Sequence, residues 1–424
     1  MSRERGAGKV LFVGHGAERT GPPIGLLHLL RWIAANTDID FEVLLLEGGD
    51  LLPDYQALAP VTVLHEGARP ARLAQIGQAL AEKHGATRLG DRLRVWSYRR
   101  RLRHLRGFRT IYCNSAWTIR AVDYVPMTEQ TLVVAAVHEL SVGIEFHLSD
   151  QHRWLLCERP DHYLVVSGAV YRYLVDRHGV DPDRISLHHE MIAIERDPPD
   201  RTPDRPGDRT FVVGGSGLLR WRKGPDLFLA IAAEVRRRRP DLDIQWDWIG
   251  GLPDDPDLPA IEFDRARAGL DDVVAFLGHV DDPIERYAEL DLLVLTSRED
   301  AYPLVCLESA SVGVPVLTFV NGGMPEFVSG AVDALDDPRA APPFEPGAPA
   351  GAVVAFPDIR SMADAVIALV DDADRRLELG ARGAARVRRW HAVDVAAPRL
   401  VADLAEWLSA TPVTVHDSSS QEHA

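Results

Sequence analysis

The sequence predicts an α/β fold built from two doubly wound domains that face each other across a cleft. Apolar runs of strand length alternate with segments of helical periodicity, which is typical of βαβ units and parallel sheets. A proline-rich stretch at 195–209 separates two such series. The chain has 424 residues, more than one hydrophobic core usually serves, so two domains of about 200 residues each are expected.

The first series, residues 1–194, is expected to form an amino-terminal Rossmann-like domain. Its expected strands lie at 9–15, 41–47, 61–64, 110–115, 131–139, 162–167 and 184–190. Its expected helices lie at 24–36, in the region up to about 106, and at 169–179. The segment 195–209, with four prolines, is expected to be a linker.

The second series, residues 210–390, is expected to form a carboxyl-terminal Rossmann-like domain. Its expected strands lie at 210–217, 243–251, 273–279, 291–297 and 314–319, and its helices at 226–240, about 303–312, 361–372 and 374–390. Residues 331–350 are expected to be a loop. A last helix within 391–412 is expected to pack back toward the first domain, followed by a disordered tail at 413–424.

Composition excludes several classes of protein. Apolar residues make up 46% of the chain and charged residues 26%, as in ordinary soluble globular proteins. A net charge of -16 argues against nucleic-acid binding, which needs clustered lysine and arginine. The three cysteines are widely spaced, which predicts free thiols in a reducing compartment.

Neither a secretory signal nor an apolar run of membrane-spanning length is visible, so a cytoplasmic protein is expected. The one basic stretch, 92–109, is expected to be a solvated helix face; contact with an anionic membrane or an acidic acceptor is the alternative.

Two turns that follow expected strands could receive a phosphate. Gly21 precedes a helix whose free N–H groups would attract an anion, although a plain strand-to-helix turn uses the same residues. Near Gly217, Arg222 and Lys223 place positive charge just before a helix, where it opposes the helix dipole unless an anion is bound. Solvated loop charge is the alternative. Neither a G-x-G-x-x-G fingerprint nor a P-loop is present.

A third turn lies in SREDAYPLVCLESASVGVPV, residues 297–316. Pro303 suits the first helical position, and Gly313 suits the helix end. Glu308 then lies about 7 Å along the helix from its start, at about 1.5 Å per residue, while Asp300 precedes it.

The free N–H groups of Leu304 and Val305 fall between these two acids. The order acid, anion site, acid suits a nucleotide sugar, which carries hydroxyls at both ends and a diphosphate between them. In the alternative interpretation, Glu299 and Asp300 only complement the helix dipole and Glu308 only faces solvent.

This stretch, followed by NGGMPEF (321–327) and VVAFPD (353–358), resembles the carboxyl-terminal signature of glycosyltransferase family 4, which has the two-Rossmann GT-B fold. GSGLLRWRKGPDLF and VVAFLGHVDD resemble upstream motifs of that domain in the same order. The resemblance is close over 210–400 and looser over 9–190. The family has two glutamates separated by seven residues; Asp300 and Glu308 keep that spacing, with aspartate in the first place.

The resemblance implies that Glu308 binds the ribose hydroxyls and that Asp300 or Glu299 faces the donor sugar. Lys223 matches the family lysine that holds the diphosphate together with the helix amides. Leu218 stands where the family has an arginine, so Arg220 or Arg222 would have to replace it.

His138 matches the strand-end histidine that contacts the donor sugar, although a lone strand-end histidine is as often structural. Tyr302 and Pro303 replace family residues beside the sugar pocket. Gly21, Gly217 and Leu277 complete the expected donor-binding set.

We therefore expect a retaining glycosyltransferase of the hexosyltransferase type, which moves a sugar from a nucleoside diphosphate to a small-molecule acceptor, with natural-product biosynthesis as one setting. No cofactor or metal is expected beyond the nucleotide-sugar co-substrate. The alternatives are a same-fold sugar-nucleotide epimerase or hydrolase and a non-catalytic nucleotide-sugar binding protein.

Overall fold

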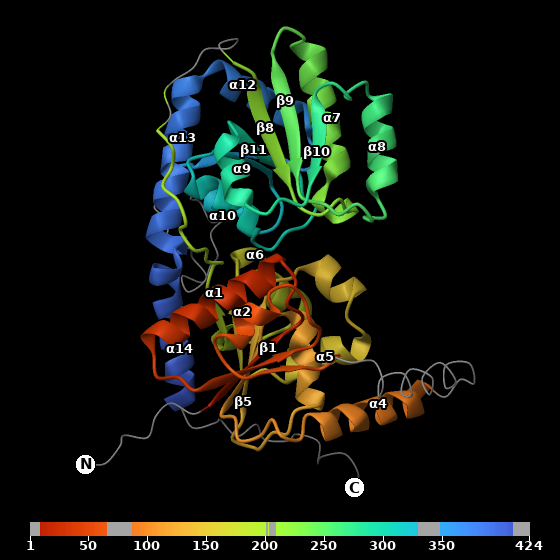
Figure 1. Cartoon of the computed structure of the whole chain (residues 1–424), viewed down its shortest axis with the longest axis vertical. Helices are drawn as coiled ribbons and strands as arrows, with labels where there is room; N and C mark the ends of the chain where they lie inside the picture. The colour runs from red at the N-terminus through yellow and green to blue at the C-terminus, as the bar shows by residue number, and fades with distance from the viewer. Residues whose placement is uncertain (1–8, 66–86, 201, 203–208, 330–347, 410–424) are drawn as a thin grey trace.

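The chain folds into two lobes stacked along the long axis of the molecule (Figure 1). The structure, a computed structural model, describes residues 9–65, 87–200, 202, 209–329 and 348–409. The expected tail at 413–424, most of the expected loop at 331–350 and part of the expected linker lie outside these residues. None of the described helices is both long and apolar enough to cross a membrane.

The amino-terminal lobe is built on a parallel sheet with strand order β3-β2-β1-β4-β5-β6-β7. Its strands are β1 (Val10–Gly14), β2 (Phe41–Leu45), β3 (Val61–Val63), β4 (Thr110–Cys113), β5 (Leu132–Val137), β6 (His162–Val165) and β7 (Ile185–Leu187). The strands are apolar and mostly buried on both faces, as expected of a sheet covered by helices on both sides.

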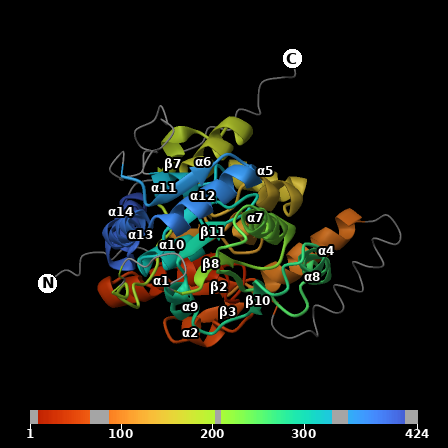
Figure 2. The same cartoon turned by 90° about the horizontal axis from the view of Figure 1, so that it is seen from above.

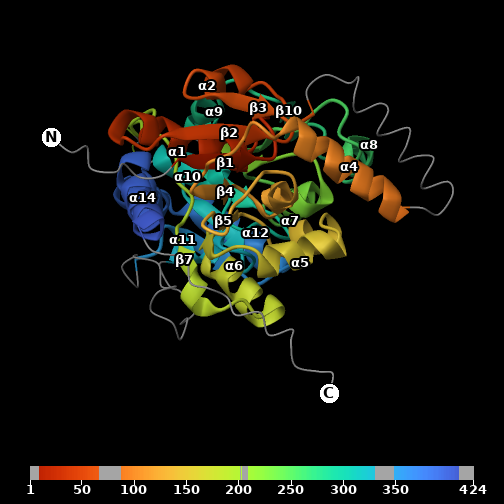
Figure 3. The same ribbon diagram turned by 90° about the horizontal axis from the view of Figure 1, so that it is seen from below.

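Helices and short helical turns connect these strands. They are α1 (Gly21–Asn36), α2 (Leu52–Gln56), α4 (Thr87–Arg101), η1 (Ala116–Asp123), η2 (Val142–Phe146), α5 (Asp150–Glu158), α6 (Gly168–Arg172), η3 (Tyr173–Arg177) and η4 (Pro182–Arg184). Seen from below, α1 and α14 lie together at one side of the sheet and α5 lies at another (Figure 3).

The carboxyl-terminal lobe repeats the arrangement with strand order β10-β9-β8-β11-β12-β13. Its strands are β8 (Phe211–Ser216), β9 (Ile244–Ile249), β10 (Val274–Gly278), β11 (Leu292–Leu295), β12 (Val316–Phe319) and β13 (Gly351–Val354). In both sheets the strand order reverses beside the first strand, which is where doubly wound folds bind their ligands.

The helices of this lobe cover its sheet, and the last ones return to the other lobe. They are η5 (Trp221–Lys223), α7 (Pro225–Arg238), α8 (Leu258–Arg267), α9 (Pro283–Glu289), α10 (Leu304–Ser311), α11 (Met324–Ser329), α12 (Ile359–Asp371), α13 (Ala373–Arg386), η7 (Val387–His391) and α14 (Val393–Ser409). Helix α14 packs against α1, so the chain crosses between the lobes twice (Figures 1 and 2).

The two crossings pair with each other. Ile192 donates its N–H to the carbonyl of His391 at 2.9 Å, and Val393 donates to the carbonyl of Ile192 at 3.0 Å. The imidazole of His391 is buried there: its Nδ1 lies 2.9 Å from the carbonyl oxygen of Glu190. These contacts tie the two crossings together, and the paired segments Glu190–Ile192 and His391–Val393 are called the hinge below.

The carboxyl edges of the two sheets face each other across the lobe boundary. Gly21, at the start of α1, lies against Leu304, at the start of α10; a Cβ added to the glycine would sit 3.9 Å from Leu304 Cδ1. Similarly, Gly323, which follows β12, packs on Ser167, which follows β6. The loops that follow strands in one lobe therefore meet those of the other.

Several expected boundaries differ from those observed. Strand β13 lies where no strand was expected, next to the expected loop. Helices α2, α5, α8, α9 and α11 were not expected either. The strand expected at 184–190 ends at Leu187, because the next three side chains turn to different partners. Pro303 is the N-cap of α10, with extended backbone angles, rather than its first helical residue.

Burial at the hinge predicts a specific loss of stability in acid. Burial, with a smaller contribution from His189, lowers the pKa of His391 to about 3. The unfolded imidazole has a pKa of about 6.5, so below that pH the unfolded chain binds a proton that the folded chain does not. As the pH is lowered from 6.5 to 3, the free energy of unfolding should fall by up to about 1.4 kcal/mol per pH unit. Urea unfolding across this range measures the slope.

The variant His391→Gln should lose that part of the slope, whatever its overall stability. The matched control is His279→Gln, since that histidine is exposed on the carboxyl-terminal lobe. Equal slopes in the wild type and His391→Gln would show that His391 titrates normally in the folded state.

Candidate functional site

A cationic cluster lies after the first strand of the carboxyl-terminal sheet. Lys223 Nζ lies 2.5 Å from Asp300 Oδ2, and Arg222 Nη1 lies 3.5 Å from Asp300 Oδ1. Ser297 Oγ donates a hydrogen bond to the same carboxylate at 3.0 Å. Burial alone would raise the pKa of Asp300, but Lys223 and Arg222 outweigh it and hold the pKa below its usual value. Asp300 is thus a carboxylate, and it partly neutralises both cations.

The loop after β8, which carries these cations, is fixed by the loop after the neighbouring strand β11. Arg298 makes two hydrogen bonds to Asp226, at 2.8 and 2.6 Å, and also donates to the carbonyl of Trp221 at 2.7 Å. Gly224 has a φ of +72°, and a Cβ there would come within 2.2 Å of the carbonyl oxygen of Thr296. The close approach requires glycine, so the two loops form one platform.

Gly217 makes a second close approach possible. Its φ is +138°, and a Cβ there would lie 3.1 Å from Lys223 Cδ, so the lysine side chain crosses directly over the glycine. Arg220, by contrast, forms an ion pair at 3.0 Å with the buried Asp255, which also accepts the N–H of Leu219. Arg222 rather than Arg220 therefore stands beside Asp300.

Two helices begin at the lobe boundary without a side-chain cap. Helix α10 begins at Leu304 after Pro303, and α1 begins at Gly21, and neither N-cap side chain accepts a hydrogen bond from its helix. The amides of Leu304 and Val305 lie in the first turn of α10. The start of α10 therefore carries partial positive charge that stabilises an anion, whereas Pro22 and Pro23 leave the first turn of α1 short of N–H groups.

Glu308, one turn along α10, behaves unlike Asp300. Its carboxylate has no hydrogen-bond or ion-pair partner among the residues that the structure describes, and its side chain is only partly exposed. Burial, together with the negative charge of Glu195, raises the pKa of Glu308 to about 7. The pKa of Asp300 is therefore lowered by its two cations, whereas the pKa of Glu308, eight positions later, is raised by burial.

Glu299 is placed differently from Asp300. Its carboxylate accepts hydrogen bonds from Ser141 Oγ at 2.6 Å and from the backbone N–H of Val142 at 2.9 Å, both in the other lobe. It thus bridges the lobes at the start of η2. In this arrangement Asp300, not Glu299, is the acid in contact with Lys223.

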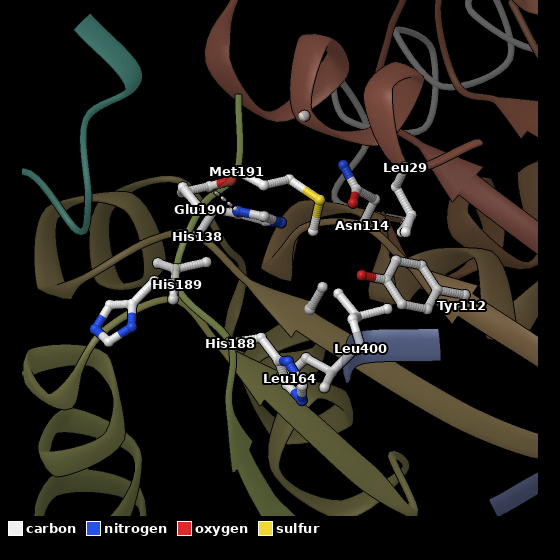
Figure 4. A pocket seen from close by; sticks show the side chains of 13 residues that line it. Leu29, Tyr112, Asn114, His138, Leu164, His188, His189, Glu190, Met191 and Leu400 are labelled. Carbon is white, nitrogen blue, oxygen red and sulfur yellow. Dashed lines mark hydrogen bonds and ion pairs between the residues drawn. The ribbon is translucent and has the colours of Figure 1, made fainter. Parts of the chain in front are cut away.

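His138 lies at the end of β5 and is held by an acid that the sequence did not single out. Its Nδ1 lies 2.5 Å from Glu190 Oε1, and its backbone N–H donates to Glu139 at 3.0 Å. Burial alone would lower the pKa of His138, but the contact with Glu190 outweighs burial and holds the pKa above its ordinary value. His138 and Glu190 line a cavity of about 30 Å³ (Figure 4).

The other expected donor-site residues occupy different surroundings. Tyr302 is 3% exposed, with its ring 4.8 Å from that of His189 and its hydroxyl 3.4 Å from His391 Nε2. It therefore packs inside the lobe interface. Leu277 lies near the carboxyl end of β10 and is partly buried against the core.

Glu326, within NGGMPEF, is a second bridging acid that sequence reasoning missed. It is 4% exposed and accepts the backbone N–H groups of Gly168 and Ala169, both at 3.1 Å, at the start of α6 in the other lobe. Its carboxylate also lies 3.2 Å from His189 Nε2. The sequence contains no local signal for these contacts, because the partners are more than 130 residues away.

The basic stretch 92–109 falls on α4 and the turn after it, at the end of the amino-terminal lobe away from the other lobe (Figure 1). Trp96 on this helix is 60% exposed. The function of the stretch stays a prediction.

Residues 209–372 match the family model of the glycosyl transferases group 1. The matched region contains the cationic cluster, α10 and both bridging acids.

Known structures resemble nearly the whole chain in fold. Anabaena Alr3699/HepE in complex with UDP and glucose superposes with a TM-score of 0.68 at 17% identity, covering 94% of this chain and 99% of that one. Sucrose-phosphate synthase from Thermosynechococcus elongatus gives 0.66 at 17% identity, covering 94% and 98%. The fold is GT-B. At these identities the likeness concerns the fold.

Curated relatives are also glycosyltransferases. The lipopolysaccharide core biosynthesis mannosyltransferase LpsB of Rhizobium meliloti is 28% identical over 67% of this chain and 76% of its own length. The D-inositol 3-phosphate glycosyltransferases of Pseudarthrobacter chlorophenolicus and Geodermatophilus obscurus are 29% and 31% identical, over 51% and 52% of this chain. The match spans about half the length of the latter two, 49% and 52%.

The bridging position of Glu326 predicts a measurable effect on stability. The substitution Glu326→Gln keeps the shape but removes the charge that strengthens two buried N–H hydrogen bonds. We expect a loss of about 1–3 kcal/mol, seen as a lower midpoint in thermal and urea unfolding. The control is Glu289→Gln, whose side chain is exposed on α9. A midpoint change no larger than the control's would argue that the lobes do not depend on this bridge.

Proposed function

We propose that this protein is a retaining glycosyltransferase that transfers a sugar from a nucleoside diphosphate to a small-molecule acceptor. The observation that carries the proposal is the arrangement of Lys223 and Arg222 beside Asp300, next to the uncapped start of α10 and one turn from Glu308. Two cations and free helix amides suit a diphosphate. The GT-B fold and the match of residues 209–372 support the same function.

In this proposal each group has a separate task. Glu308 accepts hydrogen bonds from the ribose hydroxyls. Lys223, Arg222 and the amides of Leu304 and Val305 hold the diphosphate, and they stabilise the negative charge that develops on it as the glycosidic bond breaks. Asp300 keeps Lys223 in place and faces the sugar side.

In the proposed reaction the sugar is transferred with retained configuration and no bound metal takes part. The protein stabilises the leaving diphosphate rather than supplying a nucleophile. His138, in the opposite lobe, contacts the donor sugar. The acceptor enters from the amino-terminal lobe, where resemblance to the family is looser.

The donor site can be tested by thermal melting with UDP, GDP, ADP and dTDP. A nucleotide at about 100 times its dissociation constant should stabilise the protein by roughly 2.7 kcal/mol, a shift of several degrees. Lys223→Ala and Glu308→Ala should melt cooperatively but lose most of that shift, because both residues are proposed to contact the nucleotide. Arg236→Ala, on the exposed face of α7, is the control.

Each outcome discriminates between functions. Stabilisation by one nucleotide identifies the donor base. Turnover of the matching nucleotide sugar without any acceptor product would favour an epimerase or hydrolase. Binding without turnover in any acceptor screen would favour a nucleotide-sugar binding protein. The absence of a shift with all four nucleotides would contradict the proposed donor site.

Donor binding should also depend on pH through Glu308. With a pKa of about 7 in the unliganded protein, this acid is mostly protonated at pH 6 and mostly ionised at pH 8. Because ribose hydroxyls donate to the ionised form, affinity for a nucleotide sugar should rise by up to about tenfold between these pH values. Calorimetry with UDP-glucose or GDP-mannose measures it.

In Glu308→Gln this rise should disappear. A rise of the same size in the variant would assign the pH dependence to another group and remove Glu308 from the ribose site.

A further inference from the structure

His138 is held at one ring nitrogen and free at the other. Glu190 contacts Nδ1, and the side chains of the pair are only 11% and 10% exposed. The buried Nε2 has no hydrogen-bond partner among the described residues, and the ring borders the cavity that Asn114 and Tyr112 also line (Figure 4). A carboxylate in this position sets the tautomer and the orientation of an imidazole.

Three titratable groups lie close to the imidazole of His138, each on a different element. Glu139, on the same loop, accepts the backbone N–H groups of Ala116 and His138, both at 3.0 Å. His15 follows β1. Burial lowers the pKa of His15, and the charge of His138 lowers it by a smaller amount. Glu190, after β7, is the carboxylate that contacts the ring itself. The orientation of His138 therefore depends mainly on Glu190.

Glu190 is itself fixed by the two residues that precede it and by the hinge. His188 Nε2 lies 2.8 Å from Asp403 Oδ2 on α14, and His189 Nε2 contacts the bridging acid Glu326 across the lobe boundary. The carbonyl of Glu190 accepts a hydrogen bond from the hinge imidazole. Three consecutive side chains thus reach three different elements.

We propose that Glu190 is a positioning residue, which accepts the Nδ1–H of His138 and thereby fixes the orientation of the imidazole that contacts the sugar of the bound donor. The inference rests on the proposed function, in which His138 contacts that sugar. It adds that the contact requires a carboxylate from the hinge segment, so that the histidine is correctly oriented only when the lobes are connected as observed.

The test compares a nucleotide sugar with the bare nucleotide. Calorimetry with UDP-glucose and UDP, and in parallel with GDP-mannose and GDP, gives for each pair the ratio of affinities, which isolates contacts to the sugar. The ratio should fall about 3- to 30-fold in both Glu190→Gln and His138→Ala, and no further in the double variant. Affinity for the bare nucleotide should stay within about twofold, because the carboxyl-terminal lobe binds it.

A second readout follows the imidazole directly. In protein with ¹⁵N-labelled histidine, the resonances assigned to His138 by its absence in His138→Ala should titrate at lower pH in Glu190→Gln than in the wild type. Glu190→Asp, which keeps the charge on a shorter side chain, should restore part of the difference. Glu129→Gln, which changes an exposed acid of the same lobe, is the matched control and should leave both readouts unchanged.

An unchanged affinity ratio together with an unchanged titration in Glu190→Gln would overturn the inference. If that variant lost its cooperative melting transition, Glu190→Asp would replace it, and an unaltered ratio there would overturn the inference equally. Failure of the wild type to bind any nucleotide would instead contradict the proposed function and remove the basis of this inference with it.

Discussion

The arrangement of this protein depends on one constraint: parallel strands leave unpaired backbone N–H groups in the loops and helix starts at their carboxyl edge, and here two such edges face each other. Some of these groups are satisfied across the boundary. Glu326 takes the amides that begin α6, and Glu299 takes the amide of Val142 at the start of η2. Both acids therefore hold the lobes together through backbone groups of the opposite lobe.

The starts of α1 and α10 at the same boundary lack such side-chain caps. Beside them the chain places Lys223 and Arg222, in a protein whose net charge is -16. The uncapped start of α10 beside these two cations explains why an anionic ligand is expected at this part of the interface. The same reasoning separates Asp300, kept ionised by two cations, from Glu308, whose burial keeps its proton to about pH 7.

Much of the fold could be predicted because its signals are local. Alternation of apolar strands and amphipathic helices indicated both lobes, and most expected strands lie within one or two residues of the observed ones. The exceptions have physical causes. Strand β13 has four residues after a region rich in proline and alanine. At 188–190, tertiary contacts end the strand that was expected to run to residue 190. The charged loop at Arg222 and Lys223 was also visible, since spacing and charge are properties of the chain itself.

By itself the sequence determined two α/β units, the turns that follow their first strands and the acids and cations on those turns, because periodicity, glycine positions and charge act over a few residues. Only the tertiary structure decided which side chains meet. It placed Arg222 rather than Arg220 beside Asp300, turned Tyr302 into the interface, and brought Glu190 to His138 across 52 positions and Glu326 to Gly168 across 158. Contacts over such separations depend on how two whole lobes pack at a shared hinge, and no local pattern encodes that packing.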